Sequence, residues 1–212
     1  MTARLPDTYF DRMYATSPDP WQLATRWYEQ RKYAITLSML PRRRYRHAFE
    51  PGCSIGTLTA LLAERCDHVT AIDVAGAALE IADVRLRADG CRDGARDRVT
   101  LSRGSLDQPW PPGPFDLLVL SEVAYYLEEE LLAELLRREC PRLARGATVV
   151  AAHWRHEVVG YPLSGDHANR VVAATPGLIP VGGYRDSDVV IEIFDTGSAA
   201  SVAARNGVPG AC

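Results

Sequence analysis

The sequence predicts an α/β protein built on a doubly wound, mostly parallel sheet with helices on both faces. Short apolar segments alternate with amphipathic helical segments along most of the 212 residues, as expected when parallel strands are joined by helical crossovers. The segment 115–120 is almost wholly apolar, which is typical of a strand buried on both faces. A turn of small residues at 50–56 leads from a strand into a helix, where such folds bind ligands.

The first element is an amphipathic helix at 21–40, which Asp19-Pro20 begins and Pro41 ends. Strands are then predicted at 47–50, 69–73, 99–102, 115–120, 148–152 and 189–194, and helices at 56–65, 75–88 and 127–140. We expect residues 1–195 to form one domain, with 1–46 as a helical cap or lid. Residues 196–212 are rich in Gly, Ala and Ser, and we expect them to form a flexible tail.

Charge and composition agree with a single soluble enzyme domain, which we expect to be cytoplasmic and, from the function argued below, to act on a small molecule. The net charge of −3 predicts no basic surface for a nucleic acid. No apolar run reaches membrane-spanning length, and the N-terminal residues do not resemble a signal peptide. The five cysteines show no metal-binding spacing, so we expect reduced thiols and no metal. The arginine-rich run at 42–46 is interpreted as a solvated loop.

The turn at 50–56 predicts a cofactor that contains a nucleoside. A strand stops at Glu50, and Pro51 and Gly52 break it before the helix. Small residues there let backbone amides at the start of the helix approach a ligand. The next strand ends on Asp73, where related folds place a carboxylate that binds ribose.

Three motifs use a turn of this kind, and their spacing separates them. The dinucleotide motif G-x-G-x-x-G needs glycine where Ser54 and Thr57 stand. The nucleophile elbow G-x-S-x-G of hydrolases fits with Ser54, but that elbow follows several strands and only 46 residues precede this one. The pattern of S-adenosylmethionine (SAM) methyltransferases, an acid followed by alternate glycines, fits with one Gly→Ser change. The spacing therefore favours SAM, with hydrolase and dinucleotide sites as weaker alternatives.

The predicted SAM site collects residues from the ends of several strands. Asp73 would bind the ribose hydroxyls and could also cap a helix. The methionine ammonium would donate to Glu50 or to backbone carbonyls at 50–52. Arg31 would bind the methionine carboxylate as a fork-shaped donor from a lid helix. The complete set of predicted cofactor-binding residues is Trp21, Tyr28, Arg31, Glu50, Gly52, Cys53, Ser54, Gly56, Asp73, Val74, Ser105, Leu106 and Glu122. Val74 and Leu106 would sandwich the adenine, and Ser105 would accept from its amino group.

Two residues are predicted to be catalytic. Methyl transfer is an in-line displacement in which alignment and a neutral nucleophile supply most of the rate. An ammonium must first lose a proton, which calls for a base or an orienting carboxylate. Glu122 follows the fourth strand and is the first candidate. His153 ends the fifth strand and has a side chain that titrates near neutrality.

The chain also resembles the NodS-type methyltransferases over residues 9–194. The segments that carry the resemblance are Asp19-Pro20-Trp21, residues 27–33, the turn at 52–56, Trp110-Pro111, residues 115–127 and His153-Trp154-Arg155. The resemblance implies a Rossmann-like seven-stranded sheet with one antiparallel strand. It also implies SAM-dependent N-methylation of the free amine of a de-N-acetylated chitooligosaccharide, with S-adenosylhomocysteine (SAH) as product.

Two points leave alternatives open. Many class I methyltransferases have Asp after the glycine at position 104, and this chain has Ser105, with Asp107 as the alternative partner for adenine. The cofactor motifs fit equally well an O-methyltransferase of a small natural product, or a SAM-binding module without turnover.

Overall fold

One seven-stranded sheet organises the chain in the computed structural model, which describes residues 4–88, 95–198 and 200–211. Its strands are β1 (Tyr45–Pro51), β2 (Cys66–Asp73), β3 (Val99–Arg103), β4 (Leu117–Ser121), β5 (Thr148–Trp154), β6 (Ile179–Arg185) and β7 (Val189–Asp195). They lie in the order β3-β2-β1-β4-β5-β7-β6. The first five pair in parallel, and β7 runs antiparallel to both β5 and β6. The predicted sheet and its antiparallel strand are thus confirmed.

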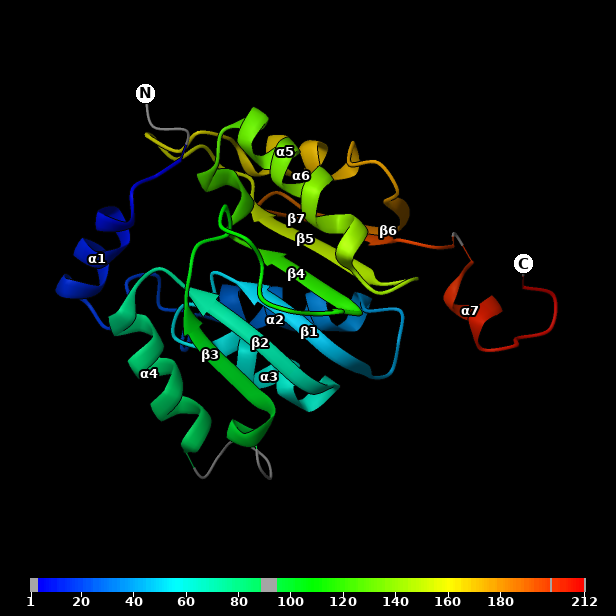
Figure 1. The fold of residues 1–212 in the computed structure, drawn as a ribbon, viewed down its shortest axis with the longest axis horizontal. Helices are drawn as coiled ribbons and strands as arrows, with labels where there is room; N and C mark the ends of the chain where they lie inside the picture. The colour runs from blue at the N-terminus through cyan, green and yellow to red at the C-terminus, as the bar shows by residue number, and fades with distance from the viewer. Residues whose placement is uncertain (1–3, 89–94, 199, 212) are drawn as a thin grey trace.

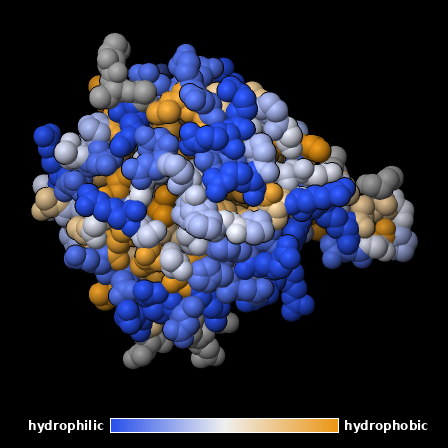
Figure 2. Space-filling model, viewed as in Figure 1, coloured by the Kyte–Doolittle hydropathy of each residue, from blue (hydrophilic) through white to orange (hydrophobic). Residues whose placement is uncertain are grey.

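Helices cover both faces of this sheet (Figure 1). They are α1 (Asp7–Thr16), α2 (Trp27–Met39), α3 (Thr57–Arg65), α4 (Gly76–Arg87), α5 (Glu129–Glu139), α6 (Gly165–Ala173) and α7 (Val202–Arg205), with short 3-10 turns η1 (Arg96–Arg98), η2 (Ala124–Tyr126) and η3 (Cys140–Arg142). One apolar core packs α5 and α6 against the sheet, and a second packs α2, α3 and α4 against its other face. Most of the outer surface seen in Figure 2 is hydrophilic.

The N-terminal region differs from the prediction of one helix over 21–40. The Asp19 carboxylate accepts hydrogen bonds from the amides of Leu23 and Ala24, at 2.8 and 3.0 Å. Gln22 has a φ of 58°, which an α-helix does not allow. This capped turn therefore delays the start of α2 to Trp27.

Three further elements were not predicted from the sequence. The edge strand β6 contains proline and two glycines, which weaken a strand signal but are tolerated at a sheet edge. The helix α6 begins at Gly165, and the hydroxyl of the preceding Ser164 caps it by accepting from the amide of His167. The helix α1 has no side-chain cap. The tail predicted for 196–212 contains α7, and Arg205 forms a 2.7 Å ion pair with Asp195; its flexibility stays a prediction.

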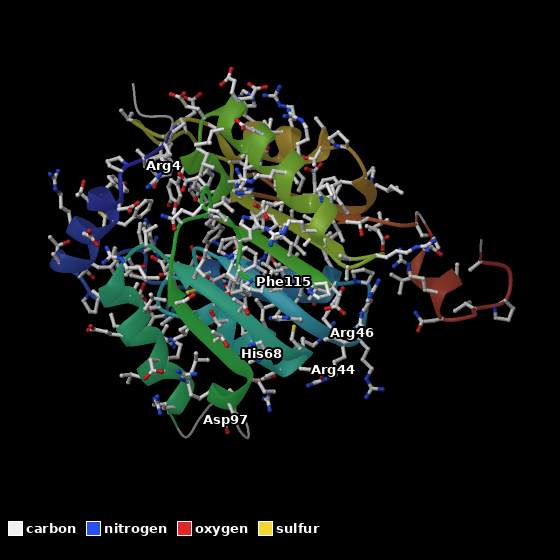
Figure 3. The ribbon with its side chains drawn as sticks, in the orientation of Figure 1. Arg4, Arg44, Arg46, His68, Asp97 and Phe115 are labelled. Carbon is white, nitrogen blue, oxygen red and sulfur yellow. The ribbon has the colours of Figure 1, made fainter. Side chains whose placement is uncertain are left out.

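The parallel strands all end on the side of the sheet where α1 lies, beyond their arrowheads in Figure 1. Arg4 lies at this end, whereas Arg44 and Arg46 lie at the opposite end (Figure 3). The arginine-rich run is therefore remote from the strand ends. No helix in the described ranges is long and apolar enough to cross a membrane. Of the cysteines, Cys53, Cys66 and Cys140 are free and buried, and Cys91 and Cys212 lie outside the described residues.

Candidate active site

A cavity of about 620 Å³ opens at the carboxyl ends of the parallel strands, within the range typical of small-molecule sites. The helices α1 and α2, the turn after β1, and the ends of β2 and β4 all contribute to its wall. Eleven of the predicted site residues line it: Trp21, Tyr28, Glu50, Gly52, Cys53, Ser54, Asp73, Val74, Ser105, Leu106 and Glu122. The strand-end argument therefore located the cavity correctly.

The turn after β1 needs its glycines for two different reasons. Gly52 has a φ of 75°, and a Cβ there would lie 2.9 Å from Cγ2 of Val123. Gly56 has a φ of 74° and starts α3, where a Cβ would lie 2.9 Å from that of Ala82 on α4. The absence of a side chain at Gly52 thus lets the turn pack against Val123, whereas its absence at Gly56 lets α3 and α4 pack closely. Gly56 is a packing residue and does not line the cavity.

Glu50 is the most unusual carboxyl group of the cavity. It ends β1, is 3% exposed, and its Oε2 has no hydrogen-bond partner in the described structure. Burial raises the pKa of Glu50 to about 8, because a charged carboxylate is poorly solvated there. A buried acceptor without a partner, placed in a cavity, is suited to a cationic ligand group.

Asp73 supports the turn as well as lining the cavity. Its Oδ2 accepts from the amide of Ser54 at 2.8 Å, and its Oδ1 from that of Ala75 at 2.9 Å. Each oxygen keeps further acceptor capacity for a ligand hydroxyl. The hydroxyl of Ser54 in turn bonds to Tyr14 of α1. The carboxylate therefore joins the cofactor turn to the end of β2, so both predicted roles are compatible.

The wall predicted to hold adenine is formed by Val74, Ser105 and Leu106. The Ser105 hydroxyl hydrogen-bonds to Asp107, which also forms a 3.0 Å ion pair with Arg4. Arg4 lines the cavity, and Asp107 lies behind this wall.

An ion triad forms another part of the cavity wall. Lys32 Nζ lies 2.7 Å from Glu29 Oε2 and 2.7 Å from Glu122 Oε1, and all three residues line the cavity. Glu122 has a φ of 55°, an uncommon conformation for a residue with a side chain. It turns the chain after β4 so that the carboxylate meets α2. Glu122 was predicted as a site residue, but Glu29 and Lys32 were not. The sequence did contain a signal for them, because Lys32 is the only lysine of the chain and Glu29 stands three residues before it, on the same side of a helix.

Besides Gly56, two predicted residues do not reach the cavity, and their roles are corrected. Arg31 points away from it and bonds to Asp186 and Tyr184, near the β6–β7 connection, at 2.9 and 2.6 Å. It clamps α2 to the sheet edge and is not placed to bind a cofactor carboxylate.

His153 is the second correction. Its side chain is 0% exposed, because alternate residues of β5 point to opposite faces and Trp154 takes the cavity side. Nδ1 bonds to Asn169 Oδ1 at 2.7 Å, and Nε2 accepts from the amide of Ala124 at 3.2 Å. With both nitrogens occupied, His153 holds the backbone beside Glu122 and does not meet an acceptor.

Aromatic rings complete the wall on the acceptor side. Tyr125 contacts Tyr126 and Tyr161, with ring centroids 4.7 and 5.2 Å apart, and Phe10 of α1 packs on Tyr126 at 4.9 Å. The cavity wall therefore combines the carboxyl groups of Glu50 and Asp73 with a cluster of aromatic rings and one buried ion triad.

Comparison with known proteins places this geometry in a family. The family model of Nodulation protein S (NodS) matches residues 10–159. Nodulation protein S of Bradyrhizobium diazoefficiens is 32% identical over 142 residues, which is 66% of this chain. The alignments cover 65%, 49% and 43% of the lengths of three curated relatives with this name, so the chain spans less than two thirds of each.

Solved structures agree with the fold. A protein from Pseudomonas syringae is 33% identical, with a TM-score of 0.66, over 80% of this chain and 99% of that one. The N-methyltransferase NodS of Bradyrhizobium japonicum, in complex with SAH, is 23% identical with a TM-score of 0.74, over 89% of this chain and 96% of that one.

Proposed function

The chain belongs to the NodS family, and from that premise we propose that it is a SAM-dependent methyltransferase acting on the free amine of a small molecule. The acceptor class is an amino sugar or a de-N-acetylated oligosaccharide. The observation that carries the proposal is one cavity that joins the Glu50–Gly56 turn and Asp73 to an acidic, aromatic wall. The Glu50–Gly56 turn and Asp73 fit a nucleoside cofactor that carries an ammonium, and the acidic, aromatic wall fits an acceptor amine.

The residues present fit SAM. The unpartnered Oε2 of Glu50 would accept from the methionine ammonium, and Asp73 has acceptor capacity for the ribose hydroxyls. Val74, Ser105 and Leu106 would enclose the adenine. SAM supplies an electrophilic methyl group on a sulfonium. A sulfonium is itself a cation, and an adjacent aromatic and acidic wall suits it.

The protein contributes alignment and exclusion of water. The turn at Gly52 packs against Val123, and the hydrogen bonds of Glu122 fix a carboxylate beside it in the cavity wall. An amine between them would donate its N–H groups to Glu122. The tyrosines of α1 and η2 would shield it from solvent. Orientation of this kind is worth several orders of magnitude in a displacement reaction.

Label transfer from methyl-labelled SAM tests the proposal. The panel holds glucosamine, de-N-acetylated chitooligosaccharides, their N-acetylated counterparts, and a set of phenols and carboxylic acids. We expect label on the free-amine sugars and none on the acetylated ones, because acetylation delocalises the nitrogen lone pair into the carbonyl and makes it a poor nucleophile. Label only on phenols or acids would replace this proposal with O-methylation. Binding of SAM without label on any member would favour a binding module.

A further inference from the structure

Lys32 is the only lysine among 212 residues, in a chain whose other 23 basic residues are arginines. Its side chain is 2% exposed, at the wall of the cavity. Its Nζ lies 5.3 and 5.4 Å from the ring centroids of Tyr28 and Tyr33. Two carboxylates and two aromatic rings therefore surround a compact charge, in a space that a planar guanidinium would not fill in the same way.

This environment keeps Lys32 charged. Burial alone would lower the pKa of a lysine, but the carboxylates of Glu122 and Glu29 outweigh burial and raise it. A buried ammonium without partners would be strongly unfavourable. Burial raises the pKa of Glu29 above its ordinary value. When both carboxylates are ionised, the triad carries one net negative charge.

Glu122 is held by three donors. Lys32 donates to Oε1 at 2.7 Å, while the Tyr125 hydroxyl and the Trp154 amide donate to Oε2 at 2.7 and 2.9 Å. A carboxylate accepts about four hydrogen bonds, so one position remains, on Oε1. The side chain is 21% exposed, and Glu122 lines the cavity. That remaining position is therefore available to an acceptor group.

The same donors make Glu122 a weak base. Burial raises the pKa of Glu122, but the charge of Lys32 and the hydrogen bonds from Lys32 and Tyr125 outweigh it and lower the pKa below its ordinary value. A carboxylate in that state does not take a proton efficiently at neutral pH. It can accept an N–H hydrogen bond without moving.

We propose that Lys32 is a positioning residue, which fixes Glu122 as an ionised hydrogen-bond acceptor that orients the acceptor amine without deprotonating it. The inference rests on the proposed function. An acceptor that arrives as an ammonium loses its proton to water. The neutral nitrogen then forms the N–CH₃ bond with its lone pair as the C–S bond breaks, and that electron pair stays on sulfur. The net negative charge of the triad favours amines over carboxylates as acceptors.

Several other groups also act on the Glu122 charge. From the elements packed around it, these are Tyr28, Glu29, Lys32 and Tyr33 of α2, Tyr125 and Tyr126 of η2, His153 of β5, and Tyr161. Burial raises the pKa of each of these tyrosines and lowers that of His153, so all of them are neutral near pH 7. Lys32 is thus the cation that balances Glu122 in this group.

The kinetic test compares Lys32→Met with Thr36→Val. Thr36 is buried one turn further along α2 and is uncharged, so its variant controls for a disturbed helix. For Lys32→Met we expect kcat/KM for a free-amine acceptor to fall roughly 30-fold or more, mostly through KM, because a buried charge pair is broken. Lys32→Arg should recover part of this loss, and Thr36→Val should stay within about twofold of wild type.

The pH profile separates positioning from plain structural damage. At saturating SAM, the wild-type kcat/KM for the acceptor should rise with pH only as the acceptor amine loses its proton. In Lys32→Met a second ionisation should appear near neutrality, because Glu29 and Glu122 then share a proton. SAM affinity, measured by calorimetry, should change less than the acceptor KM, because Lys32 contacts Glu29 and Glu122 and, among the described residues, forms no ion pair with Glu50 or Asp73. A wild-type pH profile and acceptor KM in Lys32→Met would overturn the proposal.

A second readout does not depend on activity. Selective ¹⁵N-lysine labelling gives one side-chain signal, because the chain has one lysine. Its titration should show a pKa above the ordinary value in the wild type and a lower one in Glu122→Gln. If the wild type methylates no amine, the proposed function fails separately. The lysine signal still tests the ion triad by itself. The triad is refuted if the pKa of Lys32 is not raised in the wild type, or if it is the same in Glu122→Gln.

Discussion

Replacing Glu50 by Gln tests whether Glu50 binds the cofactor, through the number of protons released when the cofactor binds. With a pKa of about 8, Glu50 is about nine-tenths protonated at pH 7 in the free protein. An ammonium bound beside its unpartnered Oε2 would favour the carboxylate. Binding of SAH at pH 7 should therefore release about 0.9 proton, and at pH 9 only about 0.1. The association constant should rise about tenfold for each pH unit between pH 6 and 7.

Calorimetry in buffers of different ionisation enthalpy measures this release directly. Glu50→Gln keeps the shape of the side chain but has no proton to lose, so the release attributed to this site should vanish and SAH should bind more weakly. Equal proton release by the wild type and Glu50→Gln, or none from the wild type at pH 7, would refute the assignment. SAH is suitable because it carries the same ammonium and is not consumed.

The stability of the free protein gives an independent check on Glu50. Its folded-state pKa is raised, so between about pH 4.5 and pH 8 the folded protein holds a proton that the unfolded chain has lost. Wild-type stability should therefore decrease across this window, relative to Glu50→Gln, by up to about 1.4 kcal/mol per pH unit. Urea unfolding at several pH values measures the difference. A constant difference would mean that Glu50 titrates normally.

Three further changes have defined outcomes. Asp73→Ala should weaken SAM binding by roughly 1.5–3 kcal/mol in calorimetry, as a lost hydrogen bond to a charged group does, and undiminished affinity would exclude the ribose role. Gly56→Ala should destabilise the fold by roughly 1–3 kcal/mol in urea unfolding, through positive φ and contact with Ala82. Gly177→Ala is the control, because Gly177 has a φ of 86° and open space around it, so this variant measures the cost of positive φ alone. An equal loss of stability in the two variants would mean that contact with Ala82 costs nothing. His153 has a pKa lowered by burial, so its contribution to stability is complete above about pH 6.5 and should fall by up to about 1.4 kcal/mol per pH unit below it. The unfolding free energy of His153→Asn should lack that decrease. The same pH dependence in the wild type and in His153→Asn would contradict the lowered pKa of His153.

The sequence by itself determined the sheet and one end of the cavity. Alternating strands and helices permit few topologies, and the carboxyl ends of parallel strands meet at one edge. Glu50, Asp73 and Glu122 each follow such a strand, so their meeting follows from chain order. The glycine turn is visible in the sequence because of the positive φ it needs, whereas the contacts of Gly52 with Val123 and of Gly56 with Ala82 come from the tertiary structure.

Only the tertiary structure decided which side chains complete the site. Arg31 and Lys32 are adjacent on α2, yet one clamps the β6–β7 connection and the other lies between two carboxylates. Neighbouring helical residues point about 100° apart, and the side that faces the cavity depends on how the whole helix packs. The same holds for His153, which one step of strand alternation turns away from the cavity. Local sequence specifies elements and their ends, whereas the direction of a side chain depends on packing between residues far apart in the chain.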